Sequence, residues 1–469
     1  MIIDLNSGDG PAEGAYDTCI IGAGAAGITL ARKLAQAGRR VALCEGGLDY
    51  YTDASQDVYR GEILGDPYFP LDSCRLRFLG GSTNHWGGMC RVFDPVDFER
   101  GDLGPEFEWP IRADAIAPFL AEACALVDVD PAFGDGPVDG SARVKHIDFK
   151  FSPPTLFEQK YRAELERSDQ IDLYLAANFL DLESDGQTAS SARFANYDGA
   201  QVTIPADRFV LAMGGIENSR MLLWLDARHG GRFFDAGLPI GRYWMEHPRT
   251  RVGEAIVSTS VEELEYFGLR SSVLRANGIM NCRLELDRQG RDRTRRLLNE
   301  ILCIAPGLGR RLVALADRNL VCGVRMRTSS EQAPFADNRI ALSEARDKFG
   351  IPFSELHWRT RQIDRDTILS SCLLFNEWLV DNDLGRIRLE DWLADGGDWP
   401  EHEDYGGNHH MGGTRMGRRD LSVVDENCRI HGSDNIYVAG SSVFATSGHA
   451  NPTLPLLQFT LRLAAHLTA

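Results

Sequence analysis

The sequence predicts an α/β fold of two domains, in which the second domain is of the α+β class. The chain has 469 residues, which is more than one hydrophobic core normally supports. A strand, a helix and a second strand follow one another near its beginning. From about residue 250 to residue 399 the pattern changes to shorter amphipathic strands and charged helices. We therefore expect a first domain built on a parallel sheet and a separate second domain.

The first periodic unit comprises the residues YDTCIIGAGAAGITLARKLAQAGRRVALCEGG. An apolar run predicts a buried strand at residues 18–21, and apolar positions at helical spacing predict a helix that runs through Leu34. A second apolar run predicts a strand at residues 41–43. This order predicts a βαβ unit.

Later segments predict further elements of both domains. We expect a helix over residues 114–127, and a strand from Phe209 followed by a glycine turn and a helix. In the second domain, NRIAL predicts a strand, and RDRTRRLLNE predicts a solvent-exposed basic surface. Near the end, NIYVAG predicts a strand, and an apolar helix starts at Leu454. The first domain is then discontinuous, with residues 1–95, 150–249 and 400–469, and the second comprises residues 96–149 and 250–399.

Composition excludes several classes of function. The formal net charge of -18 would repel nucleic acid and anionic lipid. No apolar stretch approaches the length of a membrane span, and the first residues carry no pattern of an export signal. The ten cysteines form no CxxC pair and no spacing suited to a metal. We expect reduced thiols, no metal site and a cytoplasmic location.

The turn of the βαβ unit carries a dinucleotide-binding fingerprint. Gly22, Gly24 and Gly27 occupy the GxGxxG positions, which allow a tight turn, close approach of a pyrophosphate and packing of the helix on the strand. The N-terminus of the helix then faces the phosphates with its partial positive charge. Glu45 ends the second strand, where a carboxylate accepts both ribose hydroxyls. The fingerprint predicts a Rossmann-type domain without deciding between FAD and NAD.

Four separated blocks resemble the glucose-methanol-choline (GMC) oxidoreductase family. They are IIGAGAAG with Glu45, then GGSTNHWGG, then VLAMGGIENSRMLL, and finally the pair HMGGTRMG and GHANPTLP. The likeness is greatest to the branch of pyranose oxidase and fructose dehydrogenase, and it is poor over residues 250–400. The resemblance implies FAD, a Rossmann-type FAD-binding domain, and a substrate-binding domain with a mainly antiparallel sheet flanked by helices.

The resemblance also implies a catalytic pair. In the family a histidine and a histidine or asparagine stand over the flavin, and the motifs place them here at His410 and Asn451. An imidazole that titrates near neutrality can accept the hydroxyl proton of an alcohol, and an amide can hold the developing alkoxide oxygen. His409 is the adjacent candidate, but consecutive residues of an extended segment point to opposite sides, and the motif register favours His410. His449 is expected in the wall of the pocket, and His247 is expected to satisfy a backbone group.

The fingerprint and the resemblance together give the expected cofactor contacts. In that family a histidine of the GGSTNHWGG segment can carry a covalent flavin, which would be His85 here, although we expect non-covalent FAD. Tryptophans 86, 109, 244 and 358 could stack on a sugar, but tryptophan is as often a core residue. The expected contacts are Gly22, Gly24, Ala25, Ala26, Gly27, Glu45, Gly46, Gly81, Ser82, Asn84, His85, Ala212, Gly214, Gly440, Asn451 and Thr453.

The function expected from the resemblance is oxidation of a secondary alcohol, a hydroxyl of a sugar or glycoside, with proton abstraction and hydride transfer to flavin N5. One alternative is a sterol or another non-sugar alcohol as substrate, and another is a flavin-binding redox subunit without catalysis. The electron acceptor would be oxygen, a quinone or a partner protein. The sequence does not decide between oxidase and dehydrogenase, or the oligomeric state.

Overall fold

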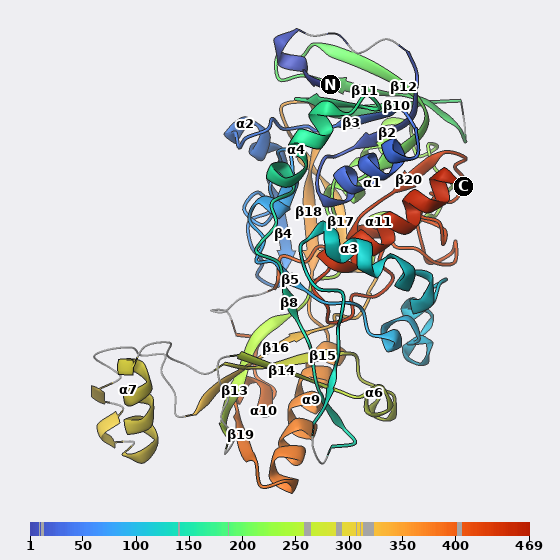
Figure 1. Ribbon diagram of the computed structural model, residues 1–469. Coiled ribbons are helices and arrows are strands. Elements are labelled where there is room, and N and C mark those ends of the chain that lie inside the picture. The colour runs from blue at the N-terminus through green and yellow to red at the C-terminus, as the bar shows by residue number, and fades with distance from the viewer. Residues whose placement is uncertain are drawn as a thin grey trace.

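The computed structural model describes residues 1–8, 10, 14–138, 141–185, 187–257, 264–287, 293–305, 307–309, 311–312, 323–400 and 406–469. The strands of this part of the chain form four sheets. The two largest sheets lie at opposite ends of the elongated molecule, and both chain termini lie at the end of the first sheet (Figure 1).

The first sheet has eight strands in the order β1-β9-β3-β2-β12-β11-β10, with β20 also paired to β12. Neighbours from β1 to β12 are parallel, β20 is parallel to β12, and β12, β11 and β10 form an antiparallel meander. The strands are β1 (Ile2–Asp4), β2 (Tyr16–Ile21), β3 (Val41–Cys44), β9 (Ile171–Leu175), β10 (Asn178–Ser184), β11 (Ala189–Ala195), β12 (Gln201–Leu211) and β20 (Ile436–Val438).

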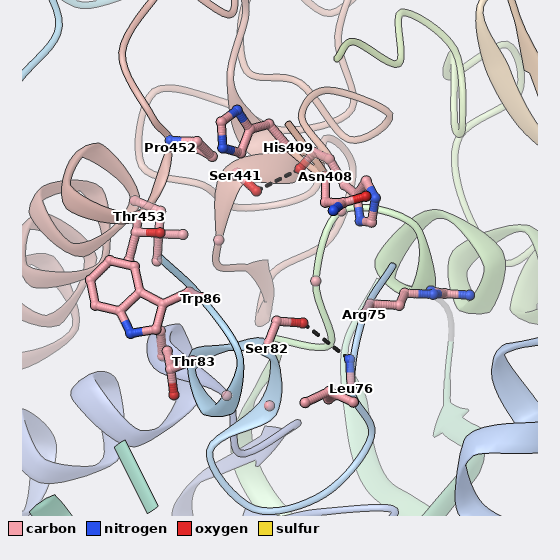
Figure 2. Close-up of a pocket in the computed structure, with 18 of the residues that line it drawn as sticks. Arg75, Leu76, Ser82, Thr83, Trp86, Asn408, His409, Ser441, Pro452 and Thr453 are labelled. Atoms are coloured by element: carbon pink, nitrogen blue, oxygen red, sulfur yellow. Dashed lines mark hydrogen bonds between the residues drawn. The ribbon is translucent and has the colours of Figure 1, made fainter. Parts of the chain in front are cut away.

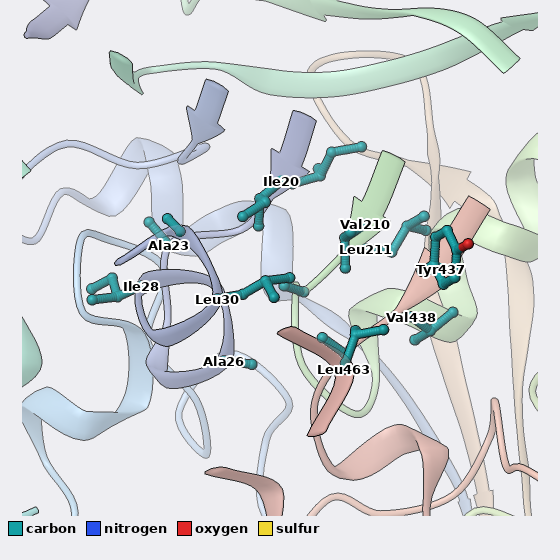
Figure 3. Close-up of a cluster of buried hydrophobic side chains, with 14 of the residues drawn as sticks. Ile20, Ala23, Ala26, Ile28, Leu30, Val210, Leu211, Tyr437, Val438 and Leu463 are labelled. Carbon is teal, nitrogen blue, oxygen red and sulfur yellow. The ribbon is translucent and has the colours of Figure 1, made fainter. Parts of the chain in front are cut away.

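Helices from distant parts of the chain cover this sheet. They are α1 (Ala25–Gln36), α4 (Phe157–Arg167), α5 (Glu217–Arg228) and α11 (Thr453–Thr468). Helices α1 and α11 pack closely on each other, and Figure 3 shows Leu30 of α1 beside Ile20 of β2, with Val210 of β12, Val438 of β20 and Leu463 of α11 in the same cluster. The beginning, middle and end of the chain therefore share one core, because each contributes an apolar strand or helix face to it.

The second sheet has seven antiparallel strands in the order β19-β13-β16-β15-β14-β7-β6. The long helix α9 (Gln362–Asp381) packs on one face and buries Phe375 and Cys372 against Leu284 and Met326. The two sheets and their helices confirm the predicted fold class. The strands are β6 (Gly136–Pro137), β7 (Val144–His146), β13 (Arg249–Val257), β14 (Leu264–Leu269), β15 (Cys282–Asp287), β16 (Val324–Ser330) and β19 (Gly385–Leu389), with short helices α6 (Ser271–Asn277) and α10 (Asp391–Ala394) nearby.

A third sheet links the two regions. Strands β17 (Arg339–Arg346) and β18 (Pro352–Trp358) are antiparallel, and β18 pairs in parallel with β4 (Gly61–Gly65). Residues 339–358 therefore pair with a segment of the first domain, whereas the sequence pattern placed them in the second. The fourth sheet consists of two short antiparallel strands, β5 (Met89–Cys90) and β8 (Lys150–Phe151).

Two local predictions differ from the structure. The helix predicted over residues 114–127 begins as two 3-10 turns, Ala113–Ala115 and Ala117–Phe119, and the α-helix α3 covers only Leu120–Leu126. Pro118 explains the delay, because a proline inside a helix removes a backbone donor and clashes with the preceding turn. Among the described cysteines eight are free, but Cys303 is disulfide-bonded, which departs from the expectation of thiols throughout.

The basic stretch RDRTRRLLNE lies partly outside the described residues, and its remainder begins helix α7 (Arg293–Ile304), which projects from the second sheet (Figure 1). Within the described ranges, no helix has both the length and the apolar character that crossing a membrane requires.

Candidate active site

A cavity of about 650 Å³ lies between the first sheet and the second. Its first wall comprises the carboxyl ends of β2 and β3 and the N-terminus of α1, with Gly22, Gly24 and Glu45. Its opposite wall comprises residues of β13, β14, β15 and β16, including Arg283 and Ser329. The volume falls within the range of about 300–1,000 Å³ typical of small-molecule sites.

The glycines of the fingerprint divide into two kinds. A Cβ atom added at Gly27 would lie 1.9 Å from the carbonyl oxygen of Gly22, so Gly27 is needed where helix α1 packs on the turn. Gly22 has φ +108 and also lies against the backbone of Ala212. At Gly24, in contrast, an added Cβ would meet no protein atom within 4 Å. Gly22 and Gly27 are therefore required by the fold, and Gly24 keeps the cavity open.

Several features of the cavity wall suit a dinucleotide. Gly214 and Gly440, like Gly24, line the cavity, and an added Cβ at either would meet no protein atom within 4 Å. Helix α1 begins at Ala25 with its N-terminal N–H groups toward this space, which suits phosphate. Glu45 accepts hydrogen bonds from the backbone N–H groups of Ala23 and Gly47, both at 2.9 Å, and these fix its carboxylate at the cavity wall. These residues would hold the adenosine and pyrophosphate of FAD.

Most predicted cofactor contacts line the cavity, and two do not. Gly27 lies behind the wall for the reason given above. The side-chain amide of Asn84 donates to the carbonyl oxygen of Leu79 at 2.8 Å, so Asn84 stabilises the loop rather than facing the cavity. The residues that do line it are Gly22, Gly24, Ala25, Ala26, Glu45, Gly46, Gly81, Ser82, His85, Ala212, Gly214, Gly440, Asn451 and Thr453.

Figure 2 shows residues 75–86 and the C-terminal residues 441–453 on the wall of the cavity. Ser82 accepts a hydrogen bond from the backbone N–H of Leu76 at 3.2 Å, while Trp86 lies beside Thr453, the first residue of α11. Trp86 is the one tryptophan of the four considered above that lines the cavity. Trp244 and Trp358 are at most 1% exposed and Trp109 packs in the core of the first domain, so these three are core residues.

The two kinds of glycine predict opposite effects of the same substitution. We expect Gly24→Ala to fold with nearly unchanged stability and to lose FAD, because the new methyl group occupies cavity space at a position with φ -84 that alanine tolerates. Gly27→Ala should instead lower the free energy of unfolding by about 1–3 kcal/mol through overpacking. Urea unfolding of the apoprotein and flavin content after gel filtration measure the two effects. Equal loss of stability in both variants would contradict this division.

At the catalytic end of the cavity, Asn451 is paired with His409. The Nε2 atom of His409 lies 3.3 Å from the Nδ2 atom of Asn451, and both residues line the cavity. The sequence register had placed His410 in this position. The two histidines do point to opposite sides as expected, but the structure reverses which of them faces Asn451.

His410 also lines the cavity, but its ring packs against an aromatic cluster. Its Nε2 atom lies 3.1 Å from the hydroxyl oxygen of Tyr68, and its ring lies 5.9 Å from that of Trp244. The Tyr68 hydroxyl donates its proton to Glu246, so it can only accept from His410. The Nε2 atom of His410 therefore carries a proton, and it cannot act as a base toward that side.

A buried carboxylate fixes the backbone of the histidine segment. The oxygens of Glu246 accept hydrogen bonds from the backbone N–H groups of His409 at 3.0 Å and Gly407 at 3.1 Å. Next to this contact, Met245 and Met411 form an isolated antiparallel bridge. These bonds tie residues 245–246 to residues 407–411, which fixes the register in which His409 meets Asn451.

The amide of Asn451 is held by an arginine from the second sheet. Arg283 on β15 donates through Nη1 to Oδ1 of Asn451 at 3.0 Å and through Nε to Glu285 at 2.9 Å. Since a guanidinium has only donors, the oxygen of the amide must face Arg283, and its NH₂ group must face His409. The position of Asn451 thus depends on both sheets.

Burial and nearby cations keep the histidines of the site neutral. Burial lowers the pKa of His409 well below its ordinary value, and the positive charge of Arg283 lowers it further. Burial also lowers the pKa of His410 to about 3 and that of His247 to about 3. A neutral imidazole retains a lone pair, so His409 is available as a proton acceptor at neutral pH.

Of two further histidines, His449 differs from its predicted place, and His247 has the predicted backbone contact and one more. His449 is fully buried behind the cavity wall, where its Nε2 atom lies 3.3 Å from Asp94, so it is not the predicted wall residue. His247 contacts the backbone carbonyl of Ser447 at 3.2 Å, as expected, but its Nδ1 atom also lies 2.9 Å from Nδ1 of His409.

Sequence reasoning missed the wall that the second sheet provides. Arg249, Arg283 and Ser329 lie side by side on β13, β15 and β16 and line the cavity with Glu285 and Tyr266. The signal was present in the strand CRLELD, where charged residues alternate with apolar ones, a pattern typical of a strand with one polar face. Its pairing with Asn451 cannot be read from spacing.

Comparisons with known proteins agree with these features. Residues 334–460 match the family model described as GMC oxidoreductase. The fructose dehydrogenase large subunit of Gluconobacter japonicus is 27% identical over 303 residues, which cover 60% of this chain and 51% of that protein. The 2-methyl-1,2-propanediol dehydrogenase of Mycolicibacterium austroafricanum is 29% identical over 140 residues, 25% of each chain. The match thus spans about half of the first relative and a quarter of the second.

Among solved structures, pyridoxine 4-oxidase from Mesorbium loti has the same fold. It superposes with a TM-score of 0.62 and 16% identity, over 96% of this chain and 99% of that chain. The family-model match and the shared fold agree with the resemblance on which the sequence interpretation depended.

Proposed function

We propose that this protein is a GMC oxidoreductase that uses FAD to oxidise an alcohol carbon of a small polar substrate, a proposal supported by the match of residues 334–460 to that family's model. The observation that supports this most directly is the juxtaposition of His409 Nε2 and Asn451 Nδ2, 3.3 Å apart, on the wall of a cavity that also contains the GxGxxG turn. A proton acceptor and an amide donor therefore meet where one substrate oxygen can contact both.

Each side chain would have a distinct part in the reaction. The Nε2 atom of His409 accepts the hydroxyl proton as the C–H bond of the alcohol breaks. The NH₂ group of Asn451 donates to the oxygen as it gains negative charge, and Arg283 keeps that group aimed by binding its carbonyl oxygen. FAD, when bound, supplies the acceptor of the hydride.

We propose a sugar or glycoside hydroxyl as the substrate group. The catalytic end is lined by Arg283, Glu285, Ser329 and Tyr266, and such a polar wall suits a polyol better than a sterol, which needs a large apolar cavity. The likeness to a fructose dehydrogenase points the same way. We accordingly propose residues 250–399 as the main part of the substrate-binding domain, without residues 339–358, which pair with the first domain.

Anaerobic mixing tests the proposal. The FAD-loaded protein is mixed with sugars, glycosides, small diols and sterols, and bleaching of the flavin band is followed. Bleaching by a sugar or glycoside supports the proposal. Bleaching by sterols alone would instead favour a sterol as the substrate. If dithionite bleaches the flavin but no alcohol does, the non-catalytic redox subunit is the better account. Reoxidation by air or by an added quinone then identifies the acceptor, and flavin released by denaturation excludes a covalent link through His85.

The pH dependence of flavin reduction should reflect the low pKa of His409. A base works in its deprotonated form, so the rate is constant above its pKa and falls tenfold per pH unit below it. Because the pKa of His409 lies well below 6.5, we expect no decline of the rate between pH 8 and pH 6 from this group. Stopped-flow experiments measure the rate of flavin reduction across this pH range. A decline of the rate with an apparent pKa near 6.5 would contradict a buried neutral base.

A further inference from the structure

Four side chains and one backbone carbonyl form a continuous series of hydrogen bonds that passes through His409. At one end the Nε2 atom of His247 lies 3.2 Å from the carbonyl oxygen of Ser447, and the Nδ1 atoms of His247 and His409 are 2.9 Å apart. At the other end, Nε2 of His409 meets Nδ2 of Asn451 at 3.3 Å, and Oδ1 of Asn451 accepts from Arg283. Every member lies at or behind the cavity wall.

The Ser447 end of the series determines where its protons lie. A carbonyl oxygen only accepts, so Nε2 of His247 must carry a proton. His247 is fully buried, and burial lowers its pKa to about 3, so it is neutral and its Nδ1 atom has a lone pair. The Nδ1 atom of His409 must then donate to it, which leaves Nε2 of His409 without a proton.

The Arg283 end leads to the same assignment independently. The guanidinium only donates, so the amide oxygen of Asn451 faces it and the amide NH₂ group faces His409. An NH₂ group can only donate, so Nε2 of His409 must accept. Two ends that share no atom therefore require the same tautomer of His409.

We propose that His247 is a positioning residue that holds His409 in the tautomer with its lone pair on Nε2, toward the cavity. This inference rests on the proposed function, in which that lone pair accepts the substrate proton. Neutral histidine carries a single ring proton, so a His409 that lost its acceptor at Nδ1 could move that proton to Nε2 and cease to be a base there. His247 never contacts the substrate in this role.

Nitrogen NMR of the FAD-loaded protein labelled with ¹⁵N-histidine tests the tautomer without any turnover. Signals of His409 are identified by their loss in His409→Gln. We expect a proton on Nδ1 and none on Nε2 of His409 in the parent protein. A proton on Nε2 would overturn the inference, whereas the proposed function would still be judged separately by flavin bleaching.

Two substitutions at position 247 separate positioning from packing. His247→Phe keeps a ring of similar size but offers no acceptor, and His247→Asn offers its amide oxygen near the place of Nδ1. We expect His247→Phe to slow flavin reduction by about 10- to 100-fold, the effect of leaving one buried donor without a partner. His247→Asn should retain the rate within about tenfold, because Nδ1–H of His409 again has an acceptor. The dissociation constant of the substrate should change little in either variant.

His449→Phe is the matched control, since this histidine is equally buried but lies outside the series. It should lower thermal stability while the tautomer of His409 and the reduction rate stay as in the parent. If His247→Phe reduces flavin as fast as the parent, or if the Asn and Phe variants lose the same activity with the same tautomer, His247 has no positioning role.

Discussion

Replacing His409 by alanine should slow flavin reduction by about 10²- to 10⁴-fold while FAD remains bound, because the substrate proton then has no positioned acceptor. The substitution leaves unchanged Glu45 and the GxGxxG turn, which would hold the adenosine part. Anaerobic stopped-flow reduction measures the rate, and the flavin content of the purified variant measures binding.

His410→Ala is the informative comparison, because the two histidines are neighbours of the same chemical type. The ring of His410 contacts Tyr68, and its backbone carbonyl accepts from Ser441 at 2.6 Å, a bond that the alanine variant keeps. We expect less than about a tenfold loss of rate, as no proton transfer is removed. A large loss in His410→Ala together with a small one in His409→Ala would restore the register that the sequence motif favoured.

The contrast between these histidines shows how far sequence reasoning extends. The βαβ unit was predictable because its signals are local: an apolar strand, glycines at the turn, a helix, and Glu45 after the next strand. The orientation of His409 was not predictable, because in the stretch NHHMGGTRMG either histidine could match the motif. The alternation of side chains shows only that the two histidines point to opposite sides. The choice is made by Glu246, which lies far away in the sequence and binds the backbone N–H of His409.

The same reasoning explains why the sequence predicted Asn451 but not Arg283, which orients its amide. The ANPTLP motif identifies the amide by residue type and by its place before α11. Arg283, which fixes the orientation of that amide, is on a strand of the second sheet, where motif agreement is poor. A hydrogen bond between segments of different sheets follows from tertiary structure, so periodicity carries no signal of it.

Substituting Asn451 should have the second-largest effect. Asn451→Ala removes the amide donor that contacts His409 at the cavity wall, and we expect flavin reduction to slow by about 10²- to 10³-fold, as for loss of one donor to a developing oxyanion. The variant should still accept FAD and should still show no acid limb above pH 6, because the groups that lower the pKa of His409 remain in place.

Asn451→Asp changes the same position without removing its volume, and here the sign of the pH effect is decisive. A carboxylate beside His409 would favour the protonated imidazole and raise its pKa, so the rate, which needs the deprotonated form, should begin to fall at a higher pH than in the parent. It would also place a negative charge where the alkoxide develops, so the rate on the plateau should fall as well. A plateau rate equal to that of the parent would show that Asn451 does not stabilise the substrate oxygen, and an acid limb that stays in place would show that residue 451 does not contact the base in solution.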